Sequence, residues 1–348
     1  MLAALANNWV PSVVDGAASK RLAPSLALNI MGLATALMIG LRFEVGGDWI
    51  PYLENYNLVQ ILAFREAISQ FDVGYSAVVL IAARLDAGMW LVNTICGLIM
   101  TLGIIRFCAR QPNPALTFLV AIPYLVIVVG MGYTRQGVAI GIILAGFADV
   151  EEKSIVRLVI YIFAAALFHK TALLMLPIAM APILRRNLVQ SVLGGLIFVT
   201  LFYVLLSDSA DQLITGYVDS DYESSGAVVR VAMNFVPAVL ALLLRKRLGF
   251  NTYQQDMWSV IALVALATLP LVIFANFTTA IDRLALFLIP LQLAVLPRIP
   301  YVFGNKSGTS TQLTLAVCGY SAAVQMVWLV FATHAQYWVP YRIYFLGE

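Results

Sequence analysis

The sequence predicts an all-α protein that crosses a membrane many times. Of its 348 residues, 61% are hydrophobic and only 11% are charged, and the mean hydropathy is +0.90. Apolar stretches of about 18 to 20 residues, long enough to span a hydrocarbon core of roughly 30 Å, recur along the whole chain. A soluble core does not need so many uninterrupted apolar runs. We therefore expect about eleven transmembrane helices, some of them short or re-entrant, together with periplasmic interfacial helices.

Each predicted span is an apolar run that ends at polar or turn-forming residues. In chain order, the predicted spans are Pro24–Leu41, Met89–Phe107, Ala115–Tyr133, Gln136–Val150, Ile155–Phe168, Thr171–Leu184, Leu188–Leu206, Ala227–Leu244, Met257–Asn276, Asp282–Leu296 and Gln312–Phe331. The fifth and sixth hold about 14 residues each, against the roughly 20 that a crossing needs. They either cross a thin region or form a re-entrant pair buried in protein.

Basic loops orient the chain, because Lys and Arg are enriched on the cytoplasmic side. If Lys20 and Arg21 lie inside, the same side also receives Arg106, Arg110, Lys153, Arg157, Arg185, Arg186, Arg245, Lys246, Arg247, Arg298 and Lys306. The acidic loop Asp208–Glu223 then lies outside. The polar segment Gln60–Ala87 also lies outside, as helices on the outer face or dipping partway into the membrane.

The domain organisation follows from this orientation. We expect an interfacial segment at 1–23, which lacks the charge-then-apolar order of a cleavable signal. A single transmembrane domain follows at 24–331, with periplasmic loops at 42–88 and 207–226, and a periplasmic tail covers 332–348.

Several chemistries are disfavoured by what the sequence lacks. The net charge is only +3 and no long basic run is present, so nucleic acid is not an expected partner. Cys96, Cys108 and Cys318 have no metal-ligand spacing. No nucleotide-type glycine loop and no Gly-x-Ser-x-Gly elbow occur. We therefore expect no metal and no cofactor.

The scarce ionisable residues gather on the predicted outer side, where the segment 42–49 (Arg-Phe-Glu-Val-Gly-Gly-Asp-Trp) leaves the first apolar run. Charges held at membrane depth are costly and mark functional sites. The outer residues at or near helix ends are Arg42, Asp48, Arg135, His169, Lys170, Arg230, Asp282 and Arg283. Arginines bind phosphate oxygens bidentately and stay charged, so this cluster suits a lipid-linked pyrophosphate.

Each of these residues also has a structural interpretation. Arg42 could snorkel at a helix end, and Asp48 could cap a loop. His169 could be a satisfied core histidine, and Asp282 could form a local ion pair with Arg283. Arg230, which follows an acidic loop, stays open between the two kinds of role.

The motifs together resemble the EpsG family of Wzy-type polysaccharide polymerases. The resemblance covers about residues 41–290, and each of its motifs is weak alone. The motifs are, in order, Leu41-Arg42, Val45-Gly46-Gly47-Asp48 with Tyr52, Asp72-Val73-Gly74-Tyr75, Arg135-Gln136 with Ala139, Leu167-Phe168-His169-Lys170-Thr171-Ala172-Leu173 with Leu176-Pro177, and Asp282-Arg283. The third motif departs from the family pattern, which has Glu-Pro-Gly-Tyr at that place.

The resemblance implies a metal-independent glycosyltransferase at the periplasmic face of the bacterial inner membrane. Undecaprenyl-pyrophosphate-linked glycans would be donor and acceptor, and the product an exopolysaccharide or related surface glycan. The bilayer, chain-length regulators and export proteins are the further expected partners. A glycan ligase, a lipid-linked glycan flippase or transporter, and an acyltransferase are the alternatives.

The expected roles follow from the chemistry. Histidine suits a general base near neutral pH, so His169 is the first choice for the base and Asp48 the second. Positive charge stabilises a departing pyrophosphate. The residues expected to bind it are Arg42, Arg135, Arg230 and Arg283. The supporting residues are Gly46, Gly47, Tyr75, Gln136, Lys170 and Asp282.

Overall fold

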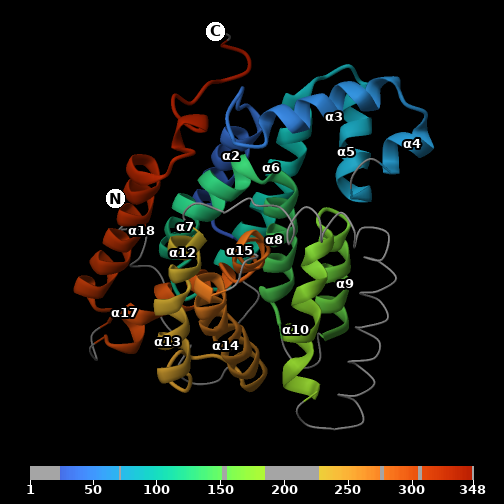
Figure 1. Cartoon of the computed structure of the whole chain (residues 1–348). Helices are drawn as coiled ribbons and strands as arrows, with labels where there is room; N and C mark the ends of the chain where they lie inside the picture. Colours follow the sequence, from blue (N-terminus) through green and yellow to red (C-terminus); the bar gives the residue numbers. More distant parts are fainter. Residues whose placement is uncertain are drawn as a thin grey trace.

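The computed structural model describes residues 24–69, 72–150, 155–184, 227–274, 278–304 and 308–346. Within these ranges the chain is helical and forms no strand (Figure 1). The helices of the first half are α2 (Leu26–Gly40), α3 (Trp49–Ile61), α4 (Phe64–Ser69), α5 (Val73–Arg84), α6 (Met89–Cys108), α7 (Pro114–Ala121), the π-helix η1 (Ile122–Gly130), α8 (Thr134–Phe147), α9 (Ile155–Ala166), η3 (Lys170–Leu174) and α10 (Met175–Leu184).

The second half is helical as well. Its helices are α12 (Ala227–Ala232), α13 (Phe235–Leu243), α14 (Thr252–Phe274), α15 (Thr278–Leu286), α16 (Pro290–Val295), η4 (Leu296–Arg298), α17 (Ile299–Val302), α18 (Thr311–Phe331) and η5 (Ala335–Tyr337).

Local capping fixes where several helices begin. Ser25 and Ser310 precede α2 and α18, and each hydroxyl accepts a hydrogen bond from a backbone N–H three residues on. Asn113 does the same for α7, and Pro114 occupies the first turn, where no amide donor is needed. These caps lie at or within two residues of the predicted starts of the corresponding spans.

Four helical segments in the described ranges are long and apolar enough to cross a membrane. They are Met89–Cys108, Thr252–Phe274, Ile281–Val302 and Thr311–Phe331. Seven further apolar helices of 10 to 17 residues occur in the described ranges, including α9 and the η3–α10 segment that were expected to be short. The described part of the chain is thus all-helical, with the apolar helices of an integral membrane protein, while the number of eleven crossings stays a prediction. The predicted segments 1–23, Leu188–Leu206 and Asp208–Glu223 lie outside the described residues.

The polar segment after α2 forms helices at one end of the molecule, where α3 lies across the ends of its neighbours (Figure 1). One side of α3 is buried, with Trp49, Tyr52 and Tyr56 packed against α5. Its other side exposes Ile50 and Ile61. Apolar side chains thus occupy both sides of α3, and the expectation that the segment 60–87 lies on the outer face or dips partway into the membrane stays a prediction.

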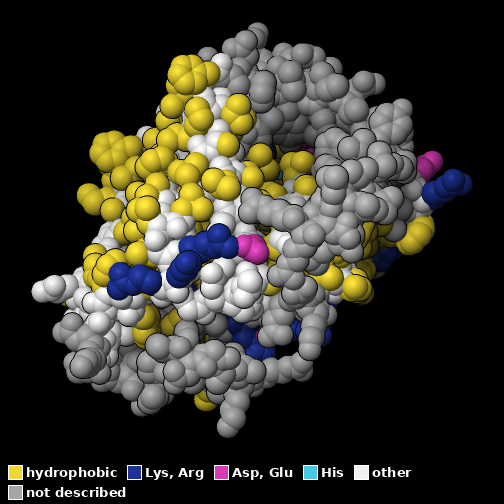
Figure 2. Space-filling model, turned by 90° about the horizontal axis from the view of Figure 1, so that it is seen from below, with side chains coloured by type: hydrophobic (Ala, Val, Ile, Leu, Met, Phe, Trp, Pro, Cys, Tyr) yellow, Lys and Arg dark blue, Asp and Glu magenta, His cyan; other side chains and the backbone are white. Residues whose placement is uncertain are grey.

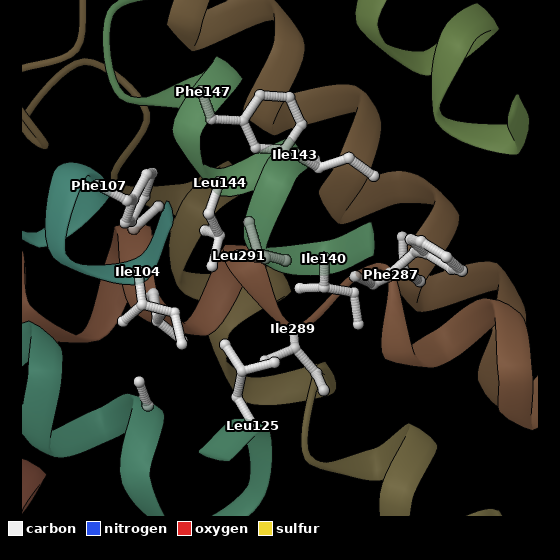
Figure 3. Packing of buried hydrophobic residues seen from close by; sticks show 14 of the residues in the cluster. Ile104, Phe107, Leu125, Ile140, Ile143, Leu144, Phe147, Phe287, Ile289 and Leu291 are labelled. Carbon is white, nitrogen blue, oxygen red and sulfur yellow. The ribbon is translucent and has the colours of Figure 1, made fainter. Parts of the chain in front are cut away.

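The core is organised around α6, which packs between α2 and α8. The approach to α8 is close, since a Cβ placed on Gly103 would lie 1.8 Å from the Gly141 carbonyl oxygen. Small residues permit such contact between membrane helices. Figure 3 shows Ile104 and Phe107 of α6 in the same cluster of buried side chains as Ile140 and Leu144 of α8.

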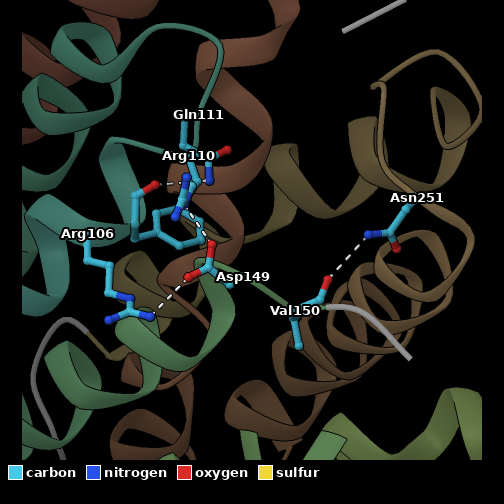
Figure 4. A network of polar contacts seen from close by, with 7 residues as sticks. Arg106, Arg110, Gln111, Asp149, Val150 and Asn251 are labelled. Atoms are coloured by element: carbon cyan, nitrogen blue, oxygen red, sulfur yellow. Dashed lines mark hydrogen bonds and ion pairs between the residues drawn. The ribbon is translucent and has the colours of Figure 1, made fainter. Parts of the chain in front are cut away.

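Basic residues hold the opposite end of the bundle together. Asp149 pairs with Arg106 and Arg110 at 3.0 and 2.7 Å (Figure 4). Arg298, which is buried, donates 2.9 Å to the Gln111 side chain and 3.3 Å to the Leu248 carbonyl. Viewed from below, Figure 2 shows Lys and Arg side chains next to an acidic one and a broad apolar surface. These residues were predicted to share the cytoplasmic side, and the described ones do share an end.

Candidate functional site

The loop between α2 and α3 is shaped by its glycines. Gly46 has a φ of +108°, and a Cβ on it would lie 2.2 Å from the Met131 carbonyl oxygen. Only glycine fits such a backbone so close to a neighbour. The loop therefore rests directly on the segment between η1 and α8, and it delivers Asp48 to the start of α3. The Asp48 side chain makes no capping hydrogen bond, so its carboxylate does not bind the backbone amides at the start of α3.

Arg42 lies beneath this loop and is only 1% exposed. Its guanidinium donates to the carbonyls of Ile39 (2.7 Å) and Val45 (3.1 Å), and to the Thr134 hydroxyl (2.8 Å). Arg42 therefore does not snorkel. These bonds tie the loop to the start of α8, which favours a positioning role. The predicted contact of Arg42 with pyrophosphate stays a prediction.

The third and fifth motifs meet in space. The Gly74 N–H donates 2.7 Å to the Leu167 carbonyl, and a Cβ on Gly74 would lie 2.9 Å from that oxygen. Asp72 also accepts a hydrogen bond from the backbone N–H of Lys170. This contact needs a glycine at position 74 and an acid at position 72. Asp72 supplies that acid.

Arg135, at the start of α8, completes this junction. Its Nη1 lies 3.2 Å from Oδ2 of Asp72, and its guanidinium carbon lies 6.0 Å from the centre of the Tyr52 ring. Burial raises the pKa of Asp72 above its ordinary value, while Arg135 opposes that rise. The side chain of Arg135 is 30% exposed, so the guanidinium is held by the protein and still reaches the surface of the site.

Arg230 and Asp282 form a second ion pair. The pairing is bidentate, with 2.7 Å from Nε to Oδ1 and 2.9 Å from Nη2 to Oδ2. Asp282 therefore pairs across helices, from α15 to α12, and not with its neighbour Arg283. The adjacent Asn234 donates 3.1 Å to the Ala285 carbonyl and fixes the same two segments.

The backbone and side chain of Arg283 contact neighbouring residues, but its guanidinium group forms no hydrogen bond to a described residue. The Gln136 side chain donates 2.7 Å to its carbonyl, and the Arg283 guanidinium carbon lies 4.1 Å from the centre of the Tyr133 ring. This distance is typical of a cation–π contact. Among the described residues, the guanidinium has no hydrogen-bond or ion-pair partner. Its bidentate donors are therefore available to a ligand.

Asp48 and His169 face the same two guanidinium groups. Burial, followed by repulsion of the charged form by Arg135 and Arg283, lowers the pKa of His169 from 6.5 to about 3. Burial raises the pKa of Asp48, and the same two arginines oppose the rise. The imidazole packs 6.1 Å from the Phe287 ring, and its nitrogens bond to no described residue. His169 is thus a buried imidazole within electrostatic reach of two guanidinium groups, with no hydrogen-bond partner among the described residues.

The site as a whole carries an excess of positive charge. Cationic side chains outnumber acidic ones among its members, which are Asp48, Asp72, Arg135, His169, Lys170, Arg230, Asp282 and Arg283. The first turns of α3, α5 and α8 also open toward it and add their partial positive charge. Such an arrangement can hold a doubly charged phosphate ester next to an imidazole and a carboxylate.

The site brings together most residues expected from the sequence, and it adds others. Tyr133 lies within electrostatic reach of Asp48, Arg230, Asp282 and Arg283 at once. Its position directly before Thr134-Arg135, between two apolar runs, is the sequence feature that could have indicated Tyr133 as a site residue. Tyr75 is fully buried, and the centre of its ring lies 5.3 Å from that of Tyr52. It therefore packs behind Tyr52, the ring that Arg135 contacts.

Comparison with known proteins identifies the family. The model of the EpsG family matches residues 25–343, nearly the whole chain. The chain belongs to the EpsG family. This is a family of Wzy-type polymerases, as the motifs had indicated, and it gives the protein a polysaccharide polymerase-type role. No curated protein and no solved structure matched the chain.

Proposed function

We propose that this EpsG-family protein polymerises undecaprenyl-pyrophosphate-linked repeat units at the periplasmic face of the bacterial inner membrane. A hydroxyl oxygen of the acceptor sugar attacks the anomeric carbon of the donor. The bond from that carbon to the pyrophosphate oxygen breaks, and undecaprenyl pyrophosphate leaves. The hydroxyl proton passes to a base of the protein, so no metal is invoked.

The open guanidinium of Arg283 carries this proposal. Arg42 is bonded inside the protein, Arg230 is closed on Asp282, and Arg135 is shared with Asp72. Arg283 lies on the Tyr133 ring with its donors directed at no described side chain. An arginine fork matches two phosphate oxygens, so Arg283 is the primary contact and Arg135 the second. Arg230 joins them when the ligand draws it from Asp282.

Proton transfer falls to His169, with Asp48 as the second choice. In the free protein, burial and the nearby arginines Arg135 and Arg283 make the imidazole a very weak base. A bound pyrophosphate cancels their field, and its own negative charge favours the imidazolium. His169 therefore gains basicity when the donor is in place, which joins donor binding to acceptor activation.

The test is reconstitution of the purified protein with lipid-linked repeat units, followed by separation of the products. We expect a ladder of lengthened glycans. Arg283→Lys keeps the charge but loses the fork, so it should lower kcat/KM by about 10- to 1000-fold. Arg106→Lys, at the opposite end of the bundle, is the matched control and should leave the ladder unchanged.

Two outcomes would contradict the proposal. A normal ladder from Arg283→Lys would remove the pyrophosphate role of that residue. Transfer of the glycan to an unrelated acceptor without lengthening would indicate a ligase instead of a polymerase.

A further inference from the structure

Residues 337–344 lie along the Gly46-Gly47 loop. The Phe43 N–H donates 2.9 Å to the Arg342 carbonyl, and the Tyr344 N–H donates 2.8 Å to the Leu41 carbonyl. The two segments of this contact run antiparallel and form an isolated β-bridge, with Arg42 opposite Ile343. The Gly46 N–H donates a hydrogen bond of 2.8 Å to the Tyr337 carbonyl, which fixes the loop at the glycine whose φ is +108°.

Trp338 links this contact to the rest of the site. Its indole is 4% exposed, and its Nε1 donates 2.9 Å to the Ile127 carbonyl of η1. A Cβ on Gly132 would lie 2.3 Å from Cζ2 of the indole, and a Cβ on Gly47 would lie 3.7 Å from Cη2. The benzene half of the indole therefore lies between the Gly46-Gly47 loop and the residue that precedes Tyr133.

Both segments beside the indole carry site residues. The first leads into Asp48, and the second into Tyr133, Thr134 and Arg135. A large rigid ring that fills the space between them sets their separation. Misplacement of a catalytic group by about 1 Å can cost 100-fold in rate, so this separation matters for catalysis.

We propose that Trp338 is a positioning residue of the site, which spaces the Asp48 loop from the segment carrying Tyr133 and Arg135. The proposal rests on the polymerase function argued above. It makes residues 337–344 part of the catalytic unit, although they lie far from every family motif in the sequence. Position 132 must then be glycine, because any side chain there would overlap the indole.

The test is a double-mutant cycle between positions 132 and 338. Gly132→Ala places a methyl group where the indole lies, so we expect kcat to fall by about 100-fold. Trp338→Phe removes the outer ring and should cost less than about 10-fold, because the aromatic side chain is retained. The double variant should recover most of the activity lost in Gly132→Ala, since its methyl group then occupies freed space. Gly319→Ala in α18, where a Cβ meets open space, is the control that should retain kcat.

The thermal unfolding midpoints of the four proteins provide a readout that does not need activity. If the double variant recovers both the kcat and the unfolding midpoint that Gly132→Ala loses, the spacer role is supported. If the double variant recovers the unfolding midpoint but not kcat, Trp338 is only a packing residue. If Gly132→Ala retains full kcat, or if the double variant is as poor as Gly132→Ala, the proposal is wrong. A wild-type protein that makes no ladder would instead refute the polymerase function, while the cycle in unfolding midpoints would still report the contact.

Discussion

The pH dependence of polymerisation provides the sharpest test of the base. In the free protein the pKa of His169 lies near 3, against an ordinary value of 6.5. The group is therefore already neutral throughout the physiological range. The acid limb of kcat/KM, which reports the free enzyme, should then carry no contribution from His169 above about pH 5.

The donor complex should behave differently. One charge at roughly 6 Å in an effective dielectric of about 20 contributes about 3 kcal/mol, or about 2 pH units in a pKa. A pyrophosphate that covers Arg135 and Arg283 should raise the pKa of His169 by at least that amount. Below the raised pKa the imidazole holds a proton and cannot accept another. The acid limb of kcat should consequently lie between about pH 5 and 7, above that of kcat/KM.

The measurement is the initial rate of ladder formation at saturating and limiting donor between pH 4.5 and 8.5. His169→Gln should lose at least about 100-fold in kcat together with the acid limb. Asp48→Asn is the comparison, and it should keep the limb. Coincident limbs for kcat and kcat/KM would refute the coupling. A limb that disappears in Asp48→Asn but persists in His169→Gln would make Asp48 the base.

The chain has two histidines, so a direct check on His169 is possible. In a His334→Gln background, the ¹⁵N NMR titration of His169 should show a midpoint that moves to higher pH when inorganic pyrophosphate is added. A midpoint that does not respond to pyrophosphate would separate the histidine from the anion site.

Two further predictions concern the loop and the orientation of the chain. Gly46→Ala forces a side chain onto the Met131 carbonyl and into a strained backbone, so it should lower the free energy of unfolding by at least about 2 kcal/mol; Gly319→Ala, which meets open space, should not move the unfolding midpoint. In a background with Cys318→Ser, a cysteine at Asn57 should react with an impermeant reagent from the periplasm and one at Lys246 should not; the reverse pattern would place the site in the cytoplasm.

The long spans could be predicted because length and composition alone define them. The span predicted at Met89–Phe107 corresponds to α6, and the one at Gln312–Phe331 to α18, within a residue at each end. The span predicted at Ala227–Leu244 is instead broken before Phe235. There Asn234 bonds to Ala285 and to the Gln292 side chain, and such distant partners cannot be read from local sequence.

The candidate site shows the same division. The charged residues of the site could be predicted from their position at helix ends on one side of the membrane, because ionisable residues are rare in an apolar chain. The pairing of Arg230 with Asp282, and of Arg135 with Asp72, depends on how α12, α15, α5 and α8 pack. Trp338 gave no signal, since an aromatic residue near an interface is ordinary.

The antiparallel contact between residues 41–43 and 342–344 also constrains biogenesis. Glu44 and its ion-pair partner Arg342 are 298 positions apart. At 5 to 20 residues per second, a ribosome needs roughly 15 to 60 s to cover that interval. During this time the Asp48 loop has entered the membrane region without the segment that fixes it. The nascent protein should therefore stay inactive toward lipid-linked sugars until its last transmembrane helix has been inserted. An assay on ribosome-stalled chains of increasing length would show activity appearing in one late step.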